Sequence, residues 1–132
     1  MSELVDYLLA RLDEEEDAAK RAGFGWGADW AAEDRFTDGY EYAVIVAQGS
    51  IDAVTSEDGD VVRHIAIHDP ARVLAEIAAK RAVLDHAERR CSDAATSGDP
   101  SACLIAGGVL EAVERLAQVY AGRDDFDPAW RS

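Results

Sequence analysis

Three histidines and two cysteines are the side chains of this sequence best suited to metal binding or nucleophilic chemistry. His64 and His68 lie four residues apart, so on a helix both imidazoles share one face, a spacing that can hold one metal ion. Further potential ligands are Asp69, His86, Cys91 and Cys103. The glutamate that separates the histidines of a zinc protease helix is absent, and there is no Cys-x-x-Cys pair. We therefore assign no metal and keep only His64, His68 and His86 as candidate ligands; the alternative is that His64 and His68 cap or pack at a helix end.

No nucleophile or cofactor motif stands out. Arg89 and Arg90 precede Cys91, and neighbouring cations favour a reactive thiolate, but Cys91 also falls on the apolar stripe of a predicted helix. We expect Cys91 and Cys103 to be reduced packing residues. The glycines of GFGWG lack the preceding strand and following helix of a dinucleotide site. We predict no catalytic residue and no cofactor, and an enzyme is the less favoured class.

The charge of the chain excludes several classes of protein. Its 132 residues carry 13 Lys and Arg against 27 Asp and Glu, a formal net charge of -14. This charge repels phosphate backbones, so we expect no direct binding to nucleic acid. No apolar run is long enough for a bilayer, and the acidic N-terminus does not resemble a signal peptide. We expect a cytoplasmic protein without membrane contact.

Residues 23–59 carry eight acidic and one basic side chain together with several aromatic residues. Aromatic residues often anchor interfaces, so we expect this segment to bind a basic host protein. The candidate contact residues are Trp26, Asp29, Trp30, Glu33, Asp34 and Asp38.

The predicted helix over residues 70–91 has a net positive charge. Its cations are Arg72, Lys80, Arg81, Arg89 and Arg90. Either the acidic segments around this helix neutralise them, or they form a basic strip for an acidic partner.

Periodicity predicts a single α+β domain in which three main helices pack with a small antiparallel hairpin. The predicted elements are a helix over 2–22, a hairpin over 40–55 that turns at Gly49 and Ser50, a short helix over 61–68, a central helix over 70–91, a helix over 100–121 and an aromatic tail over 122–132. Residues 23–36 are expected to be a loop or an irregular strand, and 91–98 a link of small residues. Asp-Pro pairs at 69, 99 and 127 predict helix starts, because Asp caps and Pro fits the first turn.

Two features of these elements leave alternatives open. The leucine stripe of the first helix can bury inside the domain or against a second copy, so homo-oligomerisation is possible. Gly107 and Gly108 either permit close helix packing or delay the helix start to about residue 109.

The segment HIAIHDPARVLAEIAAKRAVLDHAE, at residues 64–88, resembles a family of small uncharacterised proteins of actinobacteria and their bacteriophages. The opening LVDYLLARLDEEEDAA and the closing FDPAW are similar too. The motif residues are His64, His68, Asp69, Pro70, Arg72, Lys80 and Arg81. Relatives more usually carry a basic residue at the position of Ile67. The resemblance implies a cytoplasmic accessory protein encoded by a bacterium or by a phage, and no activity can be carried over from it.

Three functions are compatible with these observations. A protein-binding accessory or modulator is the leading hypothesis. A nucleic-acid mimic, whose carboxylates imitate phosphates and inhibit a DNA-binding or defence protein, is the second. A metal-binding domain or enzyme that uses His64, His68 and Asp69 is the third.

Overall fold

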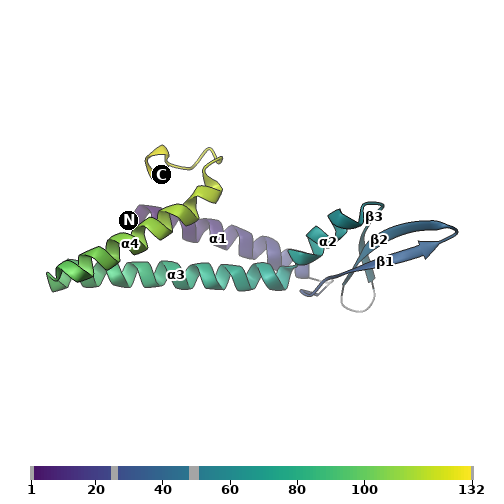
Figure 1. The fold of residues 1–132 in the computed structure, drawn as a ribbon, viewed down its shortest axis with the longest axis horizontal. Helices are drawn as coiled ribbons and strands as arrows, with labels where there is room; N and C mark the ends of the chain where they lie inside the picture. Colours follow the sequence, from purple (N-terminus) through teal and green to yellow (C-terminus); the bar gives the residue numbers. More distant parts are fainter. Residues whose placement is uncertain (1, 25–26, 48–50, 132) are drawn as a thin grey trace. The chain divides into compact units, whose positions relative to one another are not determined.

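The computed structural model describes residues 2–24, 27–47 and 51–131 (Figure 1). The helices are α1 (Ser2–Gly23), α2 (Gly59–Ile67), α3 (Pro70–Ser97) and α4 (Pro100–Ala117), and the strands are β1 (Ala31–Thr37), β2 (Tyr40–Ala47) and β3 (Ile51–Ser56). Short 3₁₀ helices cover Gln118–Tyr120 and Pro128–Trp130. The predicted α+β class is confirmed. No described helix combines the length and the apolar composition needed to cross a membrane.

The chain forms two compact units, each of which has its own buried residues. Unit 1 comprises Met1–Leu12 and Ala78–Ser132, and unit 2 comprises Asp13–Ile77. α1 and α3 each contribute one part to each unit. The single domain expected from chain length stays a prediction.

Unit 1 is helical, and its apolar stripes are buried. In α1 the leucine stripe is almost fully buried, with Leu4 at 4% exposure and Leu12 at 2%. Leu84 of α3 and Val113 of α4 are equally inaccessible. The stripe of α1 is therefore covered within the chain and does not need a second copy.

The aromatic tail lies against α1 in unit 1. Phe126 is buried, and its ring lies edge-on to that of Tyr7 at a centroid distance of 5.8 Å. Trp130 contacts both rings, at 5.2 Å from Tyr7 and 5.6 Å from Phe126. Asp127 caps the final 3₁₀ turn by accepting a hydrogen bond from the amide of Ala129. Clustered rings of this kind stabilise a fold beyond the area that they bury.

Asp125 fixes the tail by charge as well. It forms an ion pair with Arg11 at 3.0 Å and accepts hydrogen bonds from the Tyr7 hydroxyl and Arg123. Burial raises the pKa of Asp125, but the hydrogen bond from Arg123 and the charge of Arg11 outweigh it, so the net pKa is lowered. Burial and the charge of Asp125 raise the pKa of Tyr7.

Unit 2 contains a three-stranded antiparallel sheet in the order β1-β2-β3. α2 packs on this sheet through Val62, which is fully buried with Ala43 and Ile45 of β2. Trp30 and Ala32 pack against the same cluster. Side chains of a strand alternate between faces, so the face toward α2 is apolar near the middle of the sheet.

β1 replaces the expected loop or irregular strand. It pairs with β2 from Ala31↔Val46 to Thr37↔Tyr40, and the turn between them consists of Asp38 and Gly39, both at positive φ. Asp-Gly is a strong signal for a type I′ hairpin, and it marks this turn in the sequence. Of the two alternatives, the loop was wrong for Ala31–Thr37 and the strand holds; the sequence left both open because the side chains of β1 are largely exposed and give it an irregular hydropathy.

The helix limits also differ from the prediction. α3 continues to Ser97 through the predicted link, because Ala94 and Ala95 favour helix, and it ends where Gly98 adopts φ 63°. α2 starts earlier, at Gly59, where Asp58 caps the amides of Asp60 and Val61. The other expected turn, at Gly49 and Ser50, lies outside the described residues.

α4 begins at Pro100, where Asp99 accepts a hydrogen bond from the Ser101 amide. The helix therefore runs through Gly107 and Gly108 and is not delayed to residue 109. A Cβ atom at either glycine would meet no atom of the described chain within 4 Å, so they do not mediate a close approach there. α4 gives way to a 3₁₀ turn at Gln118, before the predicted end at 121.

Gly39→Ala should destabilise the protein by about 1 kcal/mol, because φ 79° is strained for a residue with a Cβ atom. Gly107→Ala is the matched control and should stabilise by about 1 kcal/mol, because that glycine is helical and has free space around it. Urea denaturation measures both changes. A destabilising effect of both substitutions would contradict these backbone conformations.

Asp125→Asn should lower the thermal midpoint at pH 7. The carboxylate has a lowered pKa in the folded state, so its contribution is present above about pH 4 and is lost as the pH falls through the folded pKa. The difference between the thermal midpoints of variant and wild type should therefore shrink as the pH falls below about 4. Asp124→Asn, at the adjacent exposed carboxylate, should have little effect at either pH. Equal midpoints for Asp125→Asn and wild type at pH 7 would contradict the described ion pair.

Candidate functional site

The two histidines of the motif lie at the end of α2 with their rings in contact. The ring centroids of His64 and His68 are 4.6 Å apart and inclined at 46°. The Nδ1 atom of His68 is 2.9 Å from the carbonyl oxygen of His64, one turn earlier. His68 is the C-cap residue of α2, and its amide donates to the Ile65 carbonyl. The spacing thus brings the two imidazoles together, and the His68 imidazole contacts the main chain at the end of the helix.

A metal shell requires more ligands than this pair. His86 belongs to unit 1, whereas His64 and His68 belong to unit 2. Within residues 2–24, 27–47 and 51–131, no group of three or more His, Cys, Asp or Glu side chains is placed to hold a metal ion.

Asp69 connects two distant parts of unit 2. Its Oδ1 atom accepts a 2.7 Å hydrogen bond from the Arg72 amide, which caps the first turn of α3. Its Oδ2 atom accepts a hydrogen bond from the amide of Trp30, immediately before β1, at 3.3 Å. The amide of Ala71 donates to the Ala28 carbonyl at 3.0 Å in the same junction. Asp69 therefore fixes the start of α3 to the segment that leads into the sheet.

The remaining motif residues extend this junction. Pro70 is buried at the first position of α3. Arg72 donates to the carbonyl of Ile67 at the end of α2 and to the carboxylate of Glu76 one turn further along α3. The run from His68 to Arg72 thus links α2, α3 and the segment before β1. Its polar contacts explain the motif as a structural feature that joins these three parts of the chain.

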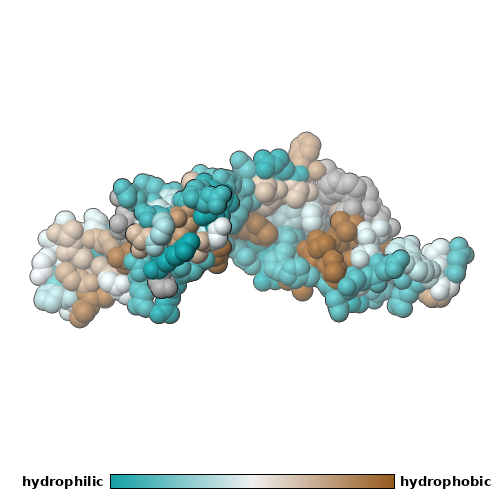
Figure 2. All heavy atoms as spheres, turned by 90° about the horizontal axis from the view of Figure 1, so that it is seen from above, coloured by the Kyte–Doolittle hydropathy of each residue, from teal (hydrophilic) through white to brown (hydrophobic). Residues whose placement is uncertain are grey.

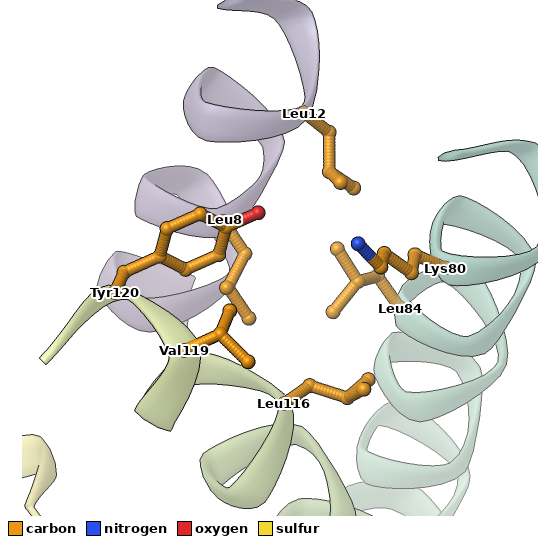
Figure 3. A pocket seen from close by; sticks show the side chains of 7 residues that line it. All are labelled: Leu8, Leu12, Lys80, Leu84, Leu116, Val119 and Tyr120. Carbon is orange, nitrogen blue, oxygen red and sulfur yellow. The ribbon is translucent and has the colours of Figure 1, made fainter. Parts of the chain in front are cut away.

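Lys80 and Arg81 lie further along α3, in unit 1. The Lys80 amine is directed toward a cavity of about 50 Å³ (Figure 3). The other lining residues are Leu8, Leu12, Leu84, Leu116, Val119 and Tyr120. Ligand pockets are usually about 300 Å³ or more, so this space is a packing gap between helices.

Several cations of α3 are neutralised by acids of their own helix. Arg89 pairs with Asp85 at 2.7 Å, and Arg90 lies 3.9 Å from Asp93. Arg72 pairs with Glu76 in the same way. The carboxylates that neutralise these three arginines therefore lie on α3 itself and not on the acidic helix or the hairpin.

The cysteines are both free. Cys91 is partly buried on α3, as expected for a packing residue. Cys103 is exposed on α4, so the expectation that it packs was wrong. The exposed Leu104 and Ile105 beside it show that this part of α4 turns its apolar residues outward. Figure 2 shows the apolar surface at the left end of the view, over the start of α4.

The sheet separates the acidic residues singled out in the sequence. Glu33 and Asp34 point to opposite faces because they are adjacent in β1. Glu33 forms an ion pair with Arg35, whereas Asp34 pairs with Arg63 of α2 at 3.3 Å. Asp38 lies in the hairpin turn.

The remaining candidates of this segment lie at its beginning. Trp30 is partly buried against the core cluster, and its indole donates to the Gly27 carbonyl. Asp29 lines a shallow surface with Trp30 and Ala31. Trp26 lies outside the described residues.

An acid-lined hollow of about 240 Å³ lies between the sheet and the start of α2. Its lining residues are Asp34, Glu41, Tyr42, Ala43, Glu57, Gly59 and Arg63. Three carboxylates and one guanidinium give it a net negative charge. The sequence analysis named Asp34 but missed Glu41 and Glu57, since only the pairing of the strands brings these residues together.

Exposed aromatic residues lie beside this hollow. Phe36 is 74% exposed and is the register partner of Glu41, so both side chains are on the same face of the sheet. Tyr40 is half exposed, and its hydrogen bond to Glu57 raises its pKa. The Asp-Gly turn between β1 and β2 is the signal that could have located both aromatic residues at a hairpin tip.

Asp69→Ala should reduce the free energy of unfolding by about 2 kcal/mol, because it removes a helix cap and the acceptor of the Trp30 amide. The matched control is Asp99→Ala, which precedes Pro100 in the same way but caps only α4. It should cost about 1 kcal/mol. Chemical denaturation of both variants checks the difference, and an equal loss would argue against the role of Asp69 as a link to the sheet.

Comparison with known proteins identifies the chain at the level of a family. No curated protein and no solved structure matches it. The sequence profile of a family of unknown function, DUF6221, matches residues 1–132. This match spans both compact units and the His-Asp-Pro motif, and the chain therefore belongs to the DUF6221 family.

Proposed function

We propose that this chain is a cytoplasmic protein-binding accessory protein that docks a basic segment of a host protein in the acid-lined hollow of unit 2. The observation that carries the proposal is the convergence of Asp34, Glu41 and Glu57, from β1, β2 and the segment before α2, around one surface depression.

The electrostatics of the hollow favour a cation. Arg63 pairs with Asp34 at 3.3 Å and with Asp60 at 3.3 Å. Arg63 thus offsets only part of the negative charge, and Glu41 and Glu57 add two further carboxylates. Lysine or arginine of a partner would gain charge-assisted hydrogen bonds from these oxygens.

Phe36 supplies the apolar part of the surface. Its ring is exposed on the same face as Glu41, and large aromatic residues next to charged rims are frequent anchors of protein interfaces. A partner segment that combines a basic residue with an apolar neighbour would use both features.

The distribution of acids supports docking over nucleic-acid mimicry. A mimic needs a continuous row of carboxylates, whereas Glu33 and Asp34 lie on opposite faces of the sheet and are both paired with arginine. The hollow instead concentrates acids at one place.

Glu41→Gln/Glu57→Gln should abolish the capture of the basic partner, because it removes two carboxylates from the hollow and leaves its shape unchanged. Immobilised variants are incubated with lysate of the source organism at about 0.15 M salt. At this ionic strength, interactions between exposed charges that lie far apart are largely screened. The partner retained by the wild-type protein is then identified and quantified.

Glu88→Gln/Asp124→Asn is the matched control, because it removes the same charge at exposed positions outside unit 2. It should retain the partner. Equal loss in both double variants would mean that net charge alone attracts the partner, and capture unaffected by Glu41→Gln/Glu57→Gln would refute the hollow as the docking site.

A further inference from the structure

β1 is an edge strand of the sheet in unit 2. The strand order is β1-β2-β3, so β1 has a strand neighbour on one side in the part of the chain that the structure describes. Edge strands present main-chain donors and acceptors that can pair with another strand. β1 contains no proline that would remove a donor.

The hairpin turn defines which main-chain groups point away from β2. In a hairpin with a two-residue turn, the flanking residues Thr37 and Tyr40 bond to each other across the strands. The direction of main-chain groups alternates along a strand, so the groups of Ala32, Asp34 and Phe36 point outward. The outer edge thus offers three evenly spaced pairs of donor and acceptor.

The contact with Asp69 supports this assignment independently. The alternation also places the Trp30 amide on the outer side, and this amide donates to Asp69 rather than to β2. The outer edge is therefore covered at its beginning by the start of α3 and continues from Ala32 onward as a strand edge.

We propose that the outer edge of β1 pairs antiparallel with β1 of a second copy of this chain, about a two-fold axis at Asp34. In this register Asp34 lies opposite its own counterpart, and Ala32 lies opposite Phe36 in both directions. All three outward-facing residues then pair with outward-facing residues, as an antiparallel ladder requires. The two sheets become one sheet of six strands.

Charge complementarity selects this register. Glu33 lies opposite the second copy's Arg35, and Arg35 lies opposite the second copy's Glu33, at non-hydrogen-bonded positions where side chains approach closely. A shift by two residues in either direction would place Glu33 opposite Glu33 or Arg35 opposite Arg35. Only the central register makes two attractive pairs.

The apolar face gains contacts in the same register. Phe36 is 74% exposed in one copy, and pairing places it over Ala32 of the other, so the ring is available to the docking partner only in the monomer. Ala32 packs against the core cluster of Ala43, Ile45 and Val62, so the second copy's phenyl ring would extend that cluster. The leucine stripe of α1 is buried and does not compete as a dimer surface.

The two central carboxylates oppose association, because like charges directly opposite are destabilising. Each Asp34 carboxylate is paired with Arg63 of its own copy, at 3.3 and 3.4 Å, which reduces the repulsion. The result is a reversible dimer held by main-chain hydrogen bonds, two cross-strand ion pairs and two Phe36 rings.

Sedimentation equilibrium of the full chain tests the proposal with reversed charges. The wild-type protein should form a concentration-dependent dimer. Glu33→Arg and Arg35→Glu alone should each weaken dimerisation roughly tenfold or more, because both cross-strand pairs become repulsive. An equimolar mixture of the two variants should restore the dimer, since every facing pair is then again attractive.

Two results separate this interface from general charge effects. Glu33→Arg makes the chain less negative, so net repulsion alone would strengthen association, whereas the proposed register predicts weakening. Glu88→Arg makes the same charge change at an exposed position of α3 in unit 1 and should leave the dimer unchanged. Circular dichroism of each variant checks that it is folded. When two folded variants are mixed, any dimer that reappears reports contacts between the chains and not the folding of either chain.

A monomeric wild-type protein at millimolar concentration would overturn the proposal. A dimer that Glu33→Arg does not weaken, or that mixing does not restore, would overturn it as well, because the two copies would then use another surface.

Discussion

The Asp69 carboxylate is the contact on which the arrangement of unit 2 depends. One oxygen caps α3, and the other receives the amide of Trp30 before β1. A single side chain thus fixes the start of the longest helix and the entry of the chain into the sheet. The same contact engages the Trp30 amide on the side away from β2, in agreement with the outward direction that the hairpin turn sets for alternate residues of β1.

The charge of the chain is organised by secondary structure. Arginines of α3 are neutralised by acids one turn away, which requires nothing from the rest of the fold. In unit 2 the alternation of a strand separates neighbouring acids onto two faces. Glu33 then lies on one face of the sheet with Arg35, whereas Asp34 lies on the other face and joins Glu41 and Glu57 at the hollow. A net charge of -14 repels phosphate backbones in general, and this division locates the surface on which the proposed docking of a basic segment rests.

Much of the fold could be predicted because its signals are local. The helices of residues 2–22 and 70–91 follow from apolar periodicity, and the Asp-Pro pairs at 99 and 127 cap as expected. β1 was left open between a loop and an irregular strand because an edge strand with exposed side chains has little hydropathy pattern, although Asp38-Gly39 marked its turn. The extension of α3 to Ser97 was missed because small polar residues are compatible with both helix and link.

The sequence by itself determined the α+β class, the helix starts at Asp-Pro and the excess of acids, since each depends on residues that are neighbours along the chain. Tertiary structure alone decided that Asp69 reaches Trp30, that Glu41 and Glu57 join Asp34, and that the leucine stripe of α1 is buried within the chain. These outcomes depend on strand register and helix packing between residues far apart in sequence. No local pattern encodes such pairings, because the free energy that selects them comes from contacts that exist only after the chain has folded.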